Sequence, residues 1–264
     1  MARVTIAVGL TMLLIGVASP ASAQPTIVQS WQPGTFPGGL AYDADRDHIW
    51  LVNNSTSELR EYTRDGTLLQ AIPGSQFGLN WLIGIDWDPV TMNLWIADEY
   101  SPEQVAQVTR DGAYVSGFSV DADMQDTSGL TYCTTNGNLY VADDNASEIV
   151  EWTTGGTLVN RWSSLPCVDT DAVCHIPFTN TLFVGDDNAA KIYEFTLDGT
   201  LLNTYDLVAL LGITGVDGLT VDPVSATLFI GDSSTPYTVY EVAGFWGPVS
   251  VQPSSWGQIK ADYR

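Results

Sequence analysis

The stretch SGLTYCTTNGNLYVADDNASEIVEWTTGGT, residues 128–157, holds the unit from which this chain is built. It predicts three short antiparallel strands at 130–132, 139–142 and 149–152, and a fourth at 158–162 follows the turn at 154–156. The strands are rich in β-branched and aromatic residues, which favour sheets. Asn136-Gly137 is a typical hairpin turn. The unit is therefore a four-stranded meander.

The same unit occurs five times along the chain. An aromatic residue of the second strand recurs at intervals of 45, 45, 43 and 46 residues, at Trp50, Trp95, Tyr140, Phe183 and Phe229. A period near 45 with four strands per copy is typical of a β-propeller. We predict an all-β fold with five four-stranded blades. Six blades are the alternative, but a sixth copy needs about 40 residues, and only 22 follow Val242.

The fifth copy lacks a fourth strand of its own. Its three strands are expected at 219–221, 228–231 and 239–242. The missing strand is at the other end of the chain, where TIVQSW (26–31) matches TLVNRW (157–162) of the third copy. An amino-terminal outer strand would close the ring and remove its open edge.

The two ends of the chain differ from the repeats. Residues 1–23 have a basic start, an apolar run and a small-residue ending, which together predict a secretory signal peptide. No later apolar run reaches the length of about 18 residues that a membrane span needs. We divide the chain into a signal peptide (1–23), a propeller (24–244) and a tail (245–264), and we expect a secreted or periplasmic protein. Trp246 and Trp256 of the tail are expected to pack against the ring, with a short recognition element as the alternative.

The chain is strongly acidic. Without the signal peptide it keeps eight basic and 31 acidic residues, a net charge of −23. Nucleic acid is excluded as a partner, because binding phosphates requires clustered lysine and arginine. The acidity serves either solubility or a site for a cation or a cationic ligand.

Three cysteines in an exported chain predict one disulfide. Cys167 and Cys174 enclose only six residues and are the expected pair. Cys133 with Cys174 is the rival pairing, because both lie in or near inner strands of neighbouring repeats.

Two stretches carry a family resemblance: GIDWDPVTMNLWIADEYSPEQVAQVTRDG (84–112) and GLTVDPVSATLFIGDSSTPYTVYEV (218–242). They resemble the repeats of NHL-type and YWTD-like propellers, and the resemblance covers about residues 26 to 242. It implies the propeller fold, although such propellers usually have six blades. The group includes protein-binding and carbohydrate-binding modules, calcium-dependent lactonases, lyases and strictosidine-synthase-like enzymes. The fold does not choose among these functions.

Acidic residues gather in two sets of loops that, by analogy with the family, lie on one face: those entering the inner strands and those leaving the second strands. The first position after the second strand (Asn53, Asp98, Asp143, Asp186, Asp232) is expected to be structural, because an aspartate there accepts backbone N–H groups of the next turn. Calcium binds several converging oxygen ligands, and the candidate ligands at the mouth of the central channel are Asp126, Asp169, Asp171 and Asp217. An acidic funnel without a cation is the alternative. The wider set of candidate binding residues adds Glu99, Asp144, Asp187 and two exposed aromatic residues, Trp81 and Tyr100.

The sequence assigns no catalytic residue. It has two histidines and no Gly-x-Ser-x-Gly elbow. The leading hypothesis is an exported binding or assembly module, more scaffold than enzyme, which meets an unknown protein, a glycan or its own copies through the acidic loop face. One alternative is a calcium-dependent, lactonase-like hydrolase or lyase with the cation at the channel mouth. Another is a glycan-binding propeller that stacks sugars on Trp81 and Tyr100.

Overall fold

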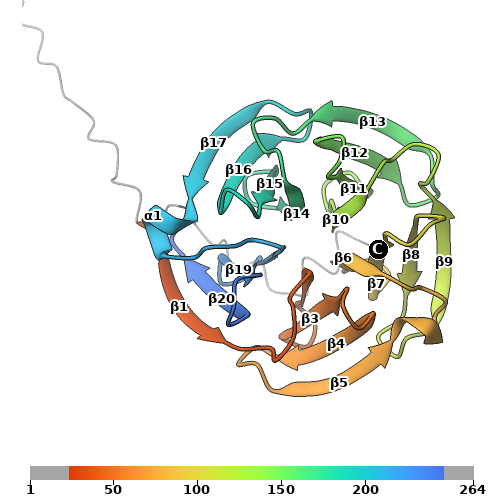
Figure 1. Cartoon of the computed structure of the whole chain (residues 1–264), viewed down its shortest axis with the longest axis horizontal. Coiled ribbons are helices and arrows are strands. Elements are labelled where there is room, and N and C mark those ends of the chain that lie inside the picture. The colour runs from red at the N-terminus through yellow and green to blue at the C-terminus, as the bar shows by residue number, and fades with distance from the viewer. Residues whose placement is uncertain (1–23, 247–264) are drawn as a thin grey trace, which may run out of the picture.

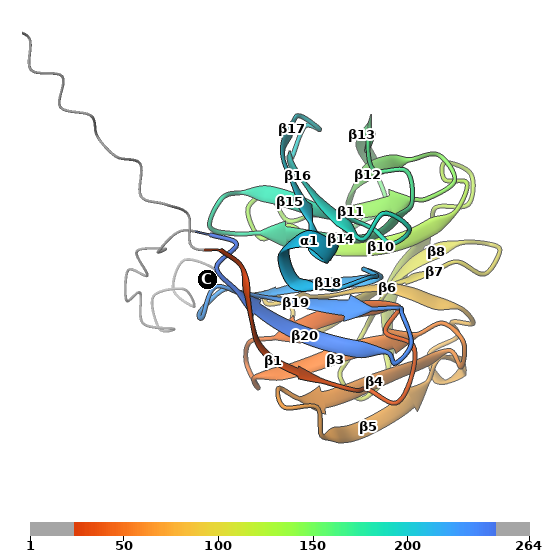
Figure 2. The same cartoon turned by 60° about the vertical axis from the view of Figure 1, so that its left-hand side comes forward.

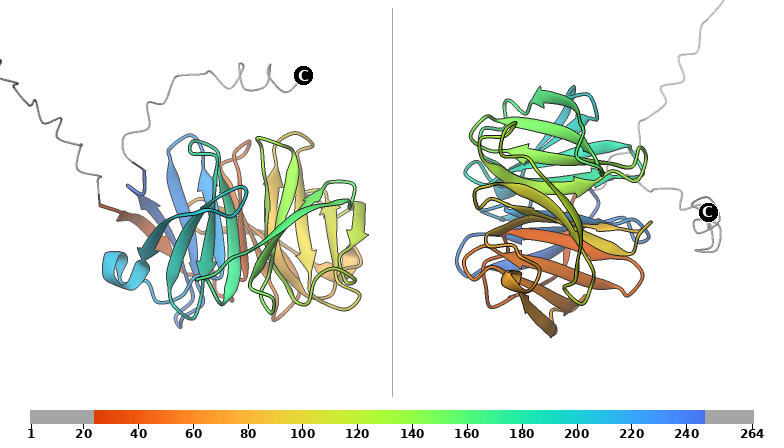
Figure 3. Two further views of the ribbon diagram at one scale, coloured as in Figure 1. Left: turned by 90° about the horizontal axis from the view of Figure 1, so that it is seen from above. Right: turned by 90° about the vertical axis from the view of Figure 1, so that its right-hand side faces the viewer.

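Residues 24–246 of the computed structural model form a ring of five blades around a central axis (Figure 1). Each blade is an antiparallel sheet of four strands, with its first strand at the axis and its fourth at the rim. The strands run between two faces that carry the loops (Figure 3). The prediction of five four-stranded blades is confirmed.

The blades follow the repeats of the sequence. Blade 1 consists of β2 (Gly39–Asp43), β3 (His48–Asn53), β4 (Glu58–Thr63) and β5 (Leu68–Pro73). Blade 2 consists of β6 (Leu82–Asp88), β7 (Asn93–Asp98), β8 (Gln104–Val108) and β9 (Tyr114–Ser119). Blade 3 consists of β10 (Thr127–Tyr132), β11 (Asn138–Asp143), β12 (Glu148–Thr153) and β13 (Leu158–Ser163). Blade 4 consists of β14 (Thr170–Ile176), β15 (Thr181–Asp186), β16 (Lys191–Thr196) and β17 (Leu201–Asp206).

Blade 5 is built from both ends of the propeller. Its strands are β18 (Gly218–Asp222), β19 (Thr227–Asp232), β20 (Thr238–Ala243) and the amino-terminal β1 (Thr26–Trp31). Strand β1 runs antiparallel along β20, as Figure 2 shows, with Trp31 opposite Val239. The Trp31 ring then contacts Tyr62 of blade 1 at a centroid distance of 4.9 Å. The predicted closure by an amino-terminal outer strand is confirmed.

The inner strands approach one another closely, which explains the glycine that four of them carry at or near their start. A Cβ atom on Gly84 would lie 2.4 Å from the Ser128 carbonyl oxygen, and one on Gly129 would lie 2.6 Å from that of Asp171. Farther out, the aromatic residues of the second strands fill the space between blades, and Trp50, Phe183 and Phe229 are fully buried.

Helix is confined to short connections within the described range. These are the 3-10 turn η1 (Gly74–Gln76) and α1 (Leu207–Leu211). No helix between residues 24 and 246 is long and apolar enough to cross a membrane. Trp246 stacks on Phe183 at a centroid distance of 5.6 Å, as expected for the start of the tail. The predicted signal peptide and Trp256 lie outside the described residues.

The predicted disulfide is wrong: Cys133, Cys167 and Cys174, all within the described range, are separate buried thiols. Side chains of a strand alternate between its two faces. Cys174 belongs to the apolar cluster that joins blade 4 to blade 5, whereas Cys167 and Cys133 belong to the cluster that joins blade 4 to blade 3. The short loop between Cys167 and Cys174 therefore leaves the two thiols on opposite sides of β14, and the rival pair is separated in the same way.

Candidate functional site at the mouth of the ring

The loops that enter the inner strands and those that follow the second strands do share one face, here called the loop face. Backbone hydrogen bonds join them, from Glu99 N to Trp81 O at 3.1 Å and from Asp144 N to Asp126 O at 3.0 Å. Acidic residues from both loop sets are therefore brought to one end of the ring.

The first acidic position after each second strand holds these loops together. Asp98 is fully buried and accepts the backbone N–H of Trp81 at 2.8 Å and of Asn80 at 3.1 Å. Asp143 and Asp186 make the same kind of contact with residues 125 and 126 and with residue 168, respectively. In blade 1, Asn53 accepts the N–H of Ser55. These residues are structural, as predicted, because their side-chain oxygens accept hydrogen bonds from backbone N–H groups.

The strongest convergence of carboxylates is Asp169, Asp171 and Asp187, here called the mouth cluster. One oxygen of each lies within 4.8 Å of the others, and all three side chains are partly exposed. Backbone contacts orient two of them: Asp169 accepts the N–H of Asn188 at 3.0 Å, and Asp187 accepts that of Val216 at 2.7 Å. The hydroxyl of Ser233 also donates to Asp187, at 2.7 Å.

Asp217, in the loop that leads into blade 5, is a fourth carboxyl group beside these three, and the mouth cluster includes it from here on. Its Oδ2 atom is buried and has no hydrogen-bond partner among residues 24–246. Burial, together with the charges of Asp217 and Asp169, raises the pKa of Asp171 to about 9. Burial and the charge of Asp187 raise the pKa of Asp217 to about 8. In the described part of the chain, no arginine or lysine pairs with these four carboxyl groups within 4.0 Å.

A second acidic group, centred on Glu99 and Asp126, lies farther round the rim. Burial and the charge of Asp126 raise the pKa of Glu99 to about 7, and burial with the charge of Glu103 raises that of Asp126. Asp126 accepts a hydrogen bond from Asn145 at 2.9 Å. Asp144 stands between the two groups and accepts the N–H of Thr170 at 2.7 Å.

The structure thus brings Asp169, Asp171 and Asp217 together, as the sequence suggested, but sets Asp187 beside them where Asp126 was expected. Glu103, whose carboxylate accepts the Thr127 N–H at 3.0 Å, was not singled out by the sequence. It lies in the loop before β8 rather than in one of the two repeating acidic positions.

The two candidate stacking residues are exposed on the same face. Trp81 is 43% exposed and Tyr100 is 59% exposed. The backbone N–H groups of both donate to Asp98, at 2.8 and 3.2 Å. They therefore flank Glu99 in the second acidic group rather than the mouth cluster.

The mouth cluster has the ligand chemistry of a calcium site. Calcium binds six to eight oxygen atoms at about 2.3 to 2.6 Å, so two oxygens on one ion lie at most about 5 Å apart. The 4.8 Å limit on the three carboxylates satisfies this condition. The buried, unpartnered Oδ2 of Asp217 and the raised pKa values fit a site in which a cation compensates the negative charge.

Comparison with known proteins supports the fold. The family model described as SdiA-regulated matches residues 116–262, more than half of the chain. No curated protein matches the chain. Three solved structures have similar folds at low sequence identity. A protein of unknown function from Bacteroides caccae is 16% identical, with a TM-score of 0.55 over 74% of this chain and 70% of its own.

The other two structures carry functional descriptions. A "putative gluconolactonase" is 15% identical, with a TM-score of 0.56 over 84% of this chain and 93% of its own. A streptogramin B lyase is 14% identical, with a TM-score of 0.51 over 88% of this chain and 76% of its own. At these identities the likeness extends to the fold alone.

Proposed function

Because the chain belongs to the SdiA-regulated family, whose members are β-propellers similar to NHL and gluconolactonase proteins, we propose that it is a calcium-dependent binding propeller. The observation that carries the proposal is the mouth cluster, where three carboxylates lie within 4.8 Å of one another without a basic partner among the described residues. Asp169, Asp171 and Asp187 would hold the ion, and the unpartnered Oδ2 of Asp217 would face it or its water.

Calcium would change what this face can bind. The acidic loop face repels anionic ligands, whereas a divalent ion at its centre attracts them and leaves coordination positions for their oxygen atoms. The ligand class is therefore an oxygen-rich group, a carboxylate or a set of sugar hydroxyls. The exposed rings of Trp81 and Tyr100 provide apolar area for stacking on the same face. We propose a secreted or periplasmic location, to which the predicted signal peptide directs the chain.

Isothermal titration of the chain from residue 24 onward with calcium tests this function. One ion per chain is expected. Asp169→Asn combined with Asp171→Asn is expected to abolish the binding, because two of the three converging charges are lost. Asp121→Asn is the matched control, since Asp121 is an exposed acid whose oxygen contacts Ser101 and Glu103 N instead of the mouth cluster. Equal binding by the double variant and the control would refute the site.

A hydrolase of the lactonase kind is the second candidate. Glu99 favours it, because a carboxyl group with a pKa of about 7 on the same rim is suited to general acid–base work at neutral pH. Hydrolysis of a panel of lactones, with and without calcium, tests the idea. Activity that needs calcium and that falls at least about 100-fold in Glu99→Gln is the expected signature of such an enzyme. Unchanged activity in Glu99→Gln would exclude that role for Glu99.

A further inference from the structure

The face opposite the loop face, here called the junction face, repeats one contact around the ring. In each turn between the third and fourth strands, one residue lies two positions before the last glycine of the turn. These residues are Arg64, Arg110, Thr154 and Leu197. Where contacts are formed, this residue reaches the end of the inner strand of the preceding blade. The inner-strand ends that correspond are Asp222, Asp43, Asp88 and Cys133.

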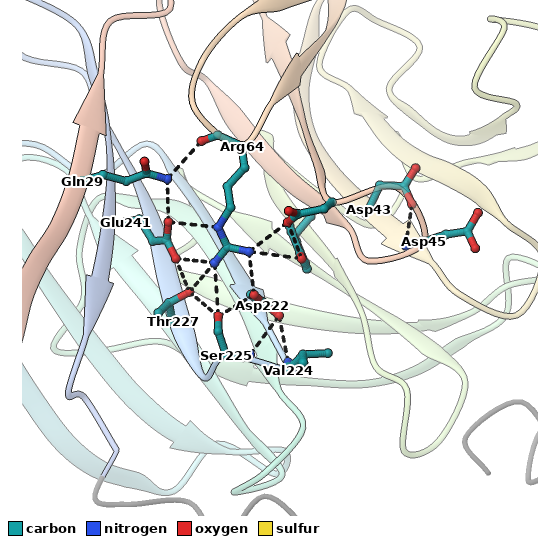
Figure 4. A network of polar contacts seen from close by, with 11 residues as sticks. Gln29, Asp43, Asp45, Arg64, Asp222, Val224, Ser225, Thr227 and Glu241 are labelled. Carbon is teal, nitrogen blue, oxygen red and sulfur yellow. Dashed lines mark hydrogen bonds and ion pairs between the residues drawn. The ribbon is translucent and has the colours of Figure 1, made fainter. Parts of the chain in front are cut away.

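Arg64 fills the junction between blades 5 and 1. Its Nη1 donates to Asp222 Oδ2 at 2.8 Å, its Nε donates to Glu241 Oε2 at 3.1 Å, and its Nη2 also pairs with Glu241. Figure 4 shows the guanidinium extending from blade 1 toward these two carboxylates. Its central carbon lies 5.6 Å from the centre of the Tyr42 ring. A guanidinium is thus held by one inner-strand aspartate, a third-strand glutamate and an inner-strand aromatic ring.

Arg110 fills the junction between blades 1 and 2 through two of these three kinds of partner, an inner-strand aspartate and an aromatic ring. Its Nη2 donates to Asp43 Oδ1 at 2.7 Å, and its central carbon lies 4.3 Å from the centre of the Trp87 ring. The two aromatic partners, Tyr42 and Trp87, occupy the same position of their inner strands, one residue before Asp43 and Asp88.

Two other junctions are filled by apolar side chains, and their inner-strand ends are apolar as well. Leu197 packs against the cluster that contains Cys133, between blades 3 and 4. Trp246 packs against the cluster that contains Ile176, between blades 4 and 5. A charged residue therefore fills each of these junctions whose inner strand ends in aspartate, and an apolar residue fills each one whose inner-strand end is apolar.

The junction between blades 2 and 3 breaks this rule. Its inner-strand end is Asp88, only 2% exposed, but its turn carries Thr154 in place of an arginine. A cavity of about 290 Å³ lies there, lined in part by Asp88, Thr91, Gln107, Tyr132 and Thr154. At about 30 Å³ per molecule, this volume equals that of roughly ten waters. It is large enough for a guanidinium and part of its aliphatic chain.

The lining keeps two of the three residue types that hold Arg64 in its own junction and replaces the third, a glutamate, with glutamine. Asp88 corresponds to Asp222, Tyr132 to Tyr42 and Gln107 to Glu241. No basic side chain of residues 24–246 pairs with Asp88 within 4.0 Å. Its Oδ2 accepts only neutral donors, Thr91 Oγ1 at 2.8 Å, Gln107 Nε2 at 3.2 Å and Trp95 Nε1 at 3.3 Å.

We propose that this cavity binds a guanidinium group supplied by another molecule. The Asp88 carboxylate already accepts hydrogen bonds from neutral groups on both oxygens, and a guanidinium would exchange one of the three neutral side-chain donors on Oδ2 for a stronger, charge-assisted bond. The planar guanidinium also lies against aromatic faces better than a compact ammonium does. Glutamate is replaced by Gln107 here, so the site holds one acidic group and suits a ligand of a single positive charge. The site lies on the face opposite the mouth cluster and is independent of calcium.

Binding of small probes tests the proposal and separates the two sources of a guanidinium. Ethylguanidine, which carries a single positive charge, represents a free small molecule, and the blocked tripeptide Gly-Arg-Gly represents an arginine of a protein partner. Titration of each into the chain from residue 24 onward is expected to give saturable binding of at least one. The same tripeptide with citrulline, which keeps the shape but loses the charge, is expected to bind at least tenfold more weakly. Calcium at saturation is expected to leave the affinity unchanged.

Thr154→Arg is the sharpest variant, because it restores the residue type that fills the two equivalent acidic junctions. It is expected to raise the melting temperature and to reduce probe binding at least tenfold. Leu197→Arg is the control at the same turn position, and it is expected to lower the melting temperature because it replaces an apolar side chain packed against the cluster of Cys133 with a charged one. Asp88→Asn, which keeps an oxygen for the Val90 and Thr91 N–H groups, is expected to lose probe binding and to remove the gain from Thr154→Arg.

Three results would overturn the proposal. Equal binding of the arginine and citrulline tripeptides would show that the cavity does not recognise charge. Unchanged probe binding in both Thr154→Arg and Asp88→Asn would show that the probes bind elsewhere on the acidic surface. Binding of neither ethylguanidine nor the arginine tripeptide to the unmodified chain would show that the cavity contains only water.

Discussion

The loop face and the junction face hold the same kind of residue under opposite electrostatic conditions. At the mouth cluster, burial and neighbouring carboxylates raise the pKa values of Asp171 and Asp217. On the junction face, burial opposes ionisation of Glu241 too, but hydrogen bonds from Arg64 and Thr227 prevail and lower its pKa. The neighbours of a carboxylate therefore determine whether it stabilises the fold through an ion pair or remains available to bind a cation.

The distribution of basic residues shows the same difference. The sequence has only nine lysines and arginines, and Arg64 and Arg110 are both used to join adjacent blades. The mouth cluster receives none of those in the described range. Arginines of the chain thus compensate two of the acidic junctions on the junction face, whereas the mouth cluster on the loop face is left for a divalent cation.

The largest effect is expected from removing the cation of the junction face. Arg64→Met keeps the aliphatic bulk but leaves Asp222 and Glu241, which are 2% and 4% exposed, without their charged partner. Loss of one partner of a buried ion pair costs about 3 to 5 kcal/mol. Urea unfolding at pH 7 should show that loss. Arg60→Met is the control, because Glu58 in the Arg60–Glu58 pair is 29% exposed, and ion pairs with an exposed carboxylate contribute at most about 1 kcal/mol. Equal losses in the two variants would contradict the role of Arg64.

The next effect concerns which carboxylates belong to the mouth cluster. At a free calcium concentration 100 times its Kd, a site that exists only in the folded state adds about 2.7 kcal/mol of stability. For a propeller of this size that corresponds to a rise in melting temperature of roughly 5 to 10 °C. Asp187→Asn is expected to remove most of the rise, whereas Asp126→Asn is expected to keep it.

Sodium chloride at matched ionic strength is the control for this measurement, because general screening also relieves repulsion between the acids. Magnesium is expected to give a smaller rise, since it retains its waters and requires tighter octahedral geometry. A rise that survives Asp187→Asn but disappears in Asp126→Asn would move the site to the second acidic group.

Much of the fold could be predicted from the sequence because propeller blades repeat. The aromatic residues at intervals near 45 gave the blade count, and the likeness of residues 26–31 to the outer strand of blade 3 gave the closure. The glycines of the inner strands have a cause that only the structure shows: a Cβ atom on Gly84 would lie 2.4 Å from the Ser128 carbonyl oxygen of the neighbouring strand.

The site was predicted less completely, because spacing along the chain does not give distances across loops. The analogy with the family placed the acids on the correct face, but whether Asp126 or Asp187 meets Asp169 depends on which loops bend toward each other across the ring. The cysteine prediction failed for a related reason, since a short separation in sequence ignores which side of β14 each thiol occupies. The junction cavity could not be predicted from the sequence either, because the sequence does not show that Thr154 and Asp88 line the same cavity.

The smallest effect is a pH dependence that has opposite signs on the two faces. Asp171 and Asp217 have raised pKa values in the folded protein, so their contribution to stability is complete below the unfolded value of about 3.9 and is lost as the pH rises through about 8 to 9. Glu241 has a lowered pKa, so its contribution is present above the unfolded value of about 4.3 and is lost only in acid. Between pH 6.5 and 8 the mouth cluster should respond, whereas Glu241 should not.

The expected result, measured with a chelator present, is a melting temperature that falls between pH 6.5 and 8 in the unmodified chain. The fall should be smaller in Asp171→Asn combined with Asp217→Asn. Comparing the two chains cancels the titration of other groups, such as the buried thiols, whose pKa values burial raises. The difference should be modest, because the mouth carboxyls are partly exposed and water screens their repulsion. Saturating calcium should remove it, since a bound cation favours the ionised carboxylates. A parallel fall in both chains would mean that the mouth cluster carries no unusual repulsion, and the contrast between the two faces would then rest on the junction arginines alone.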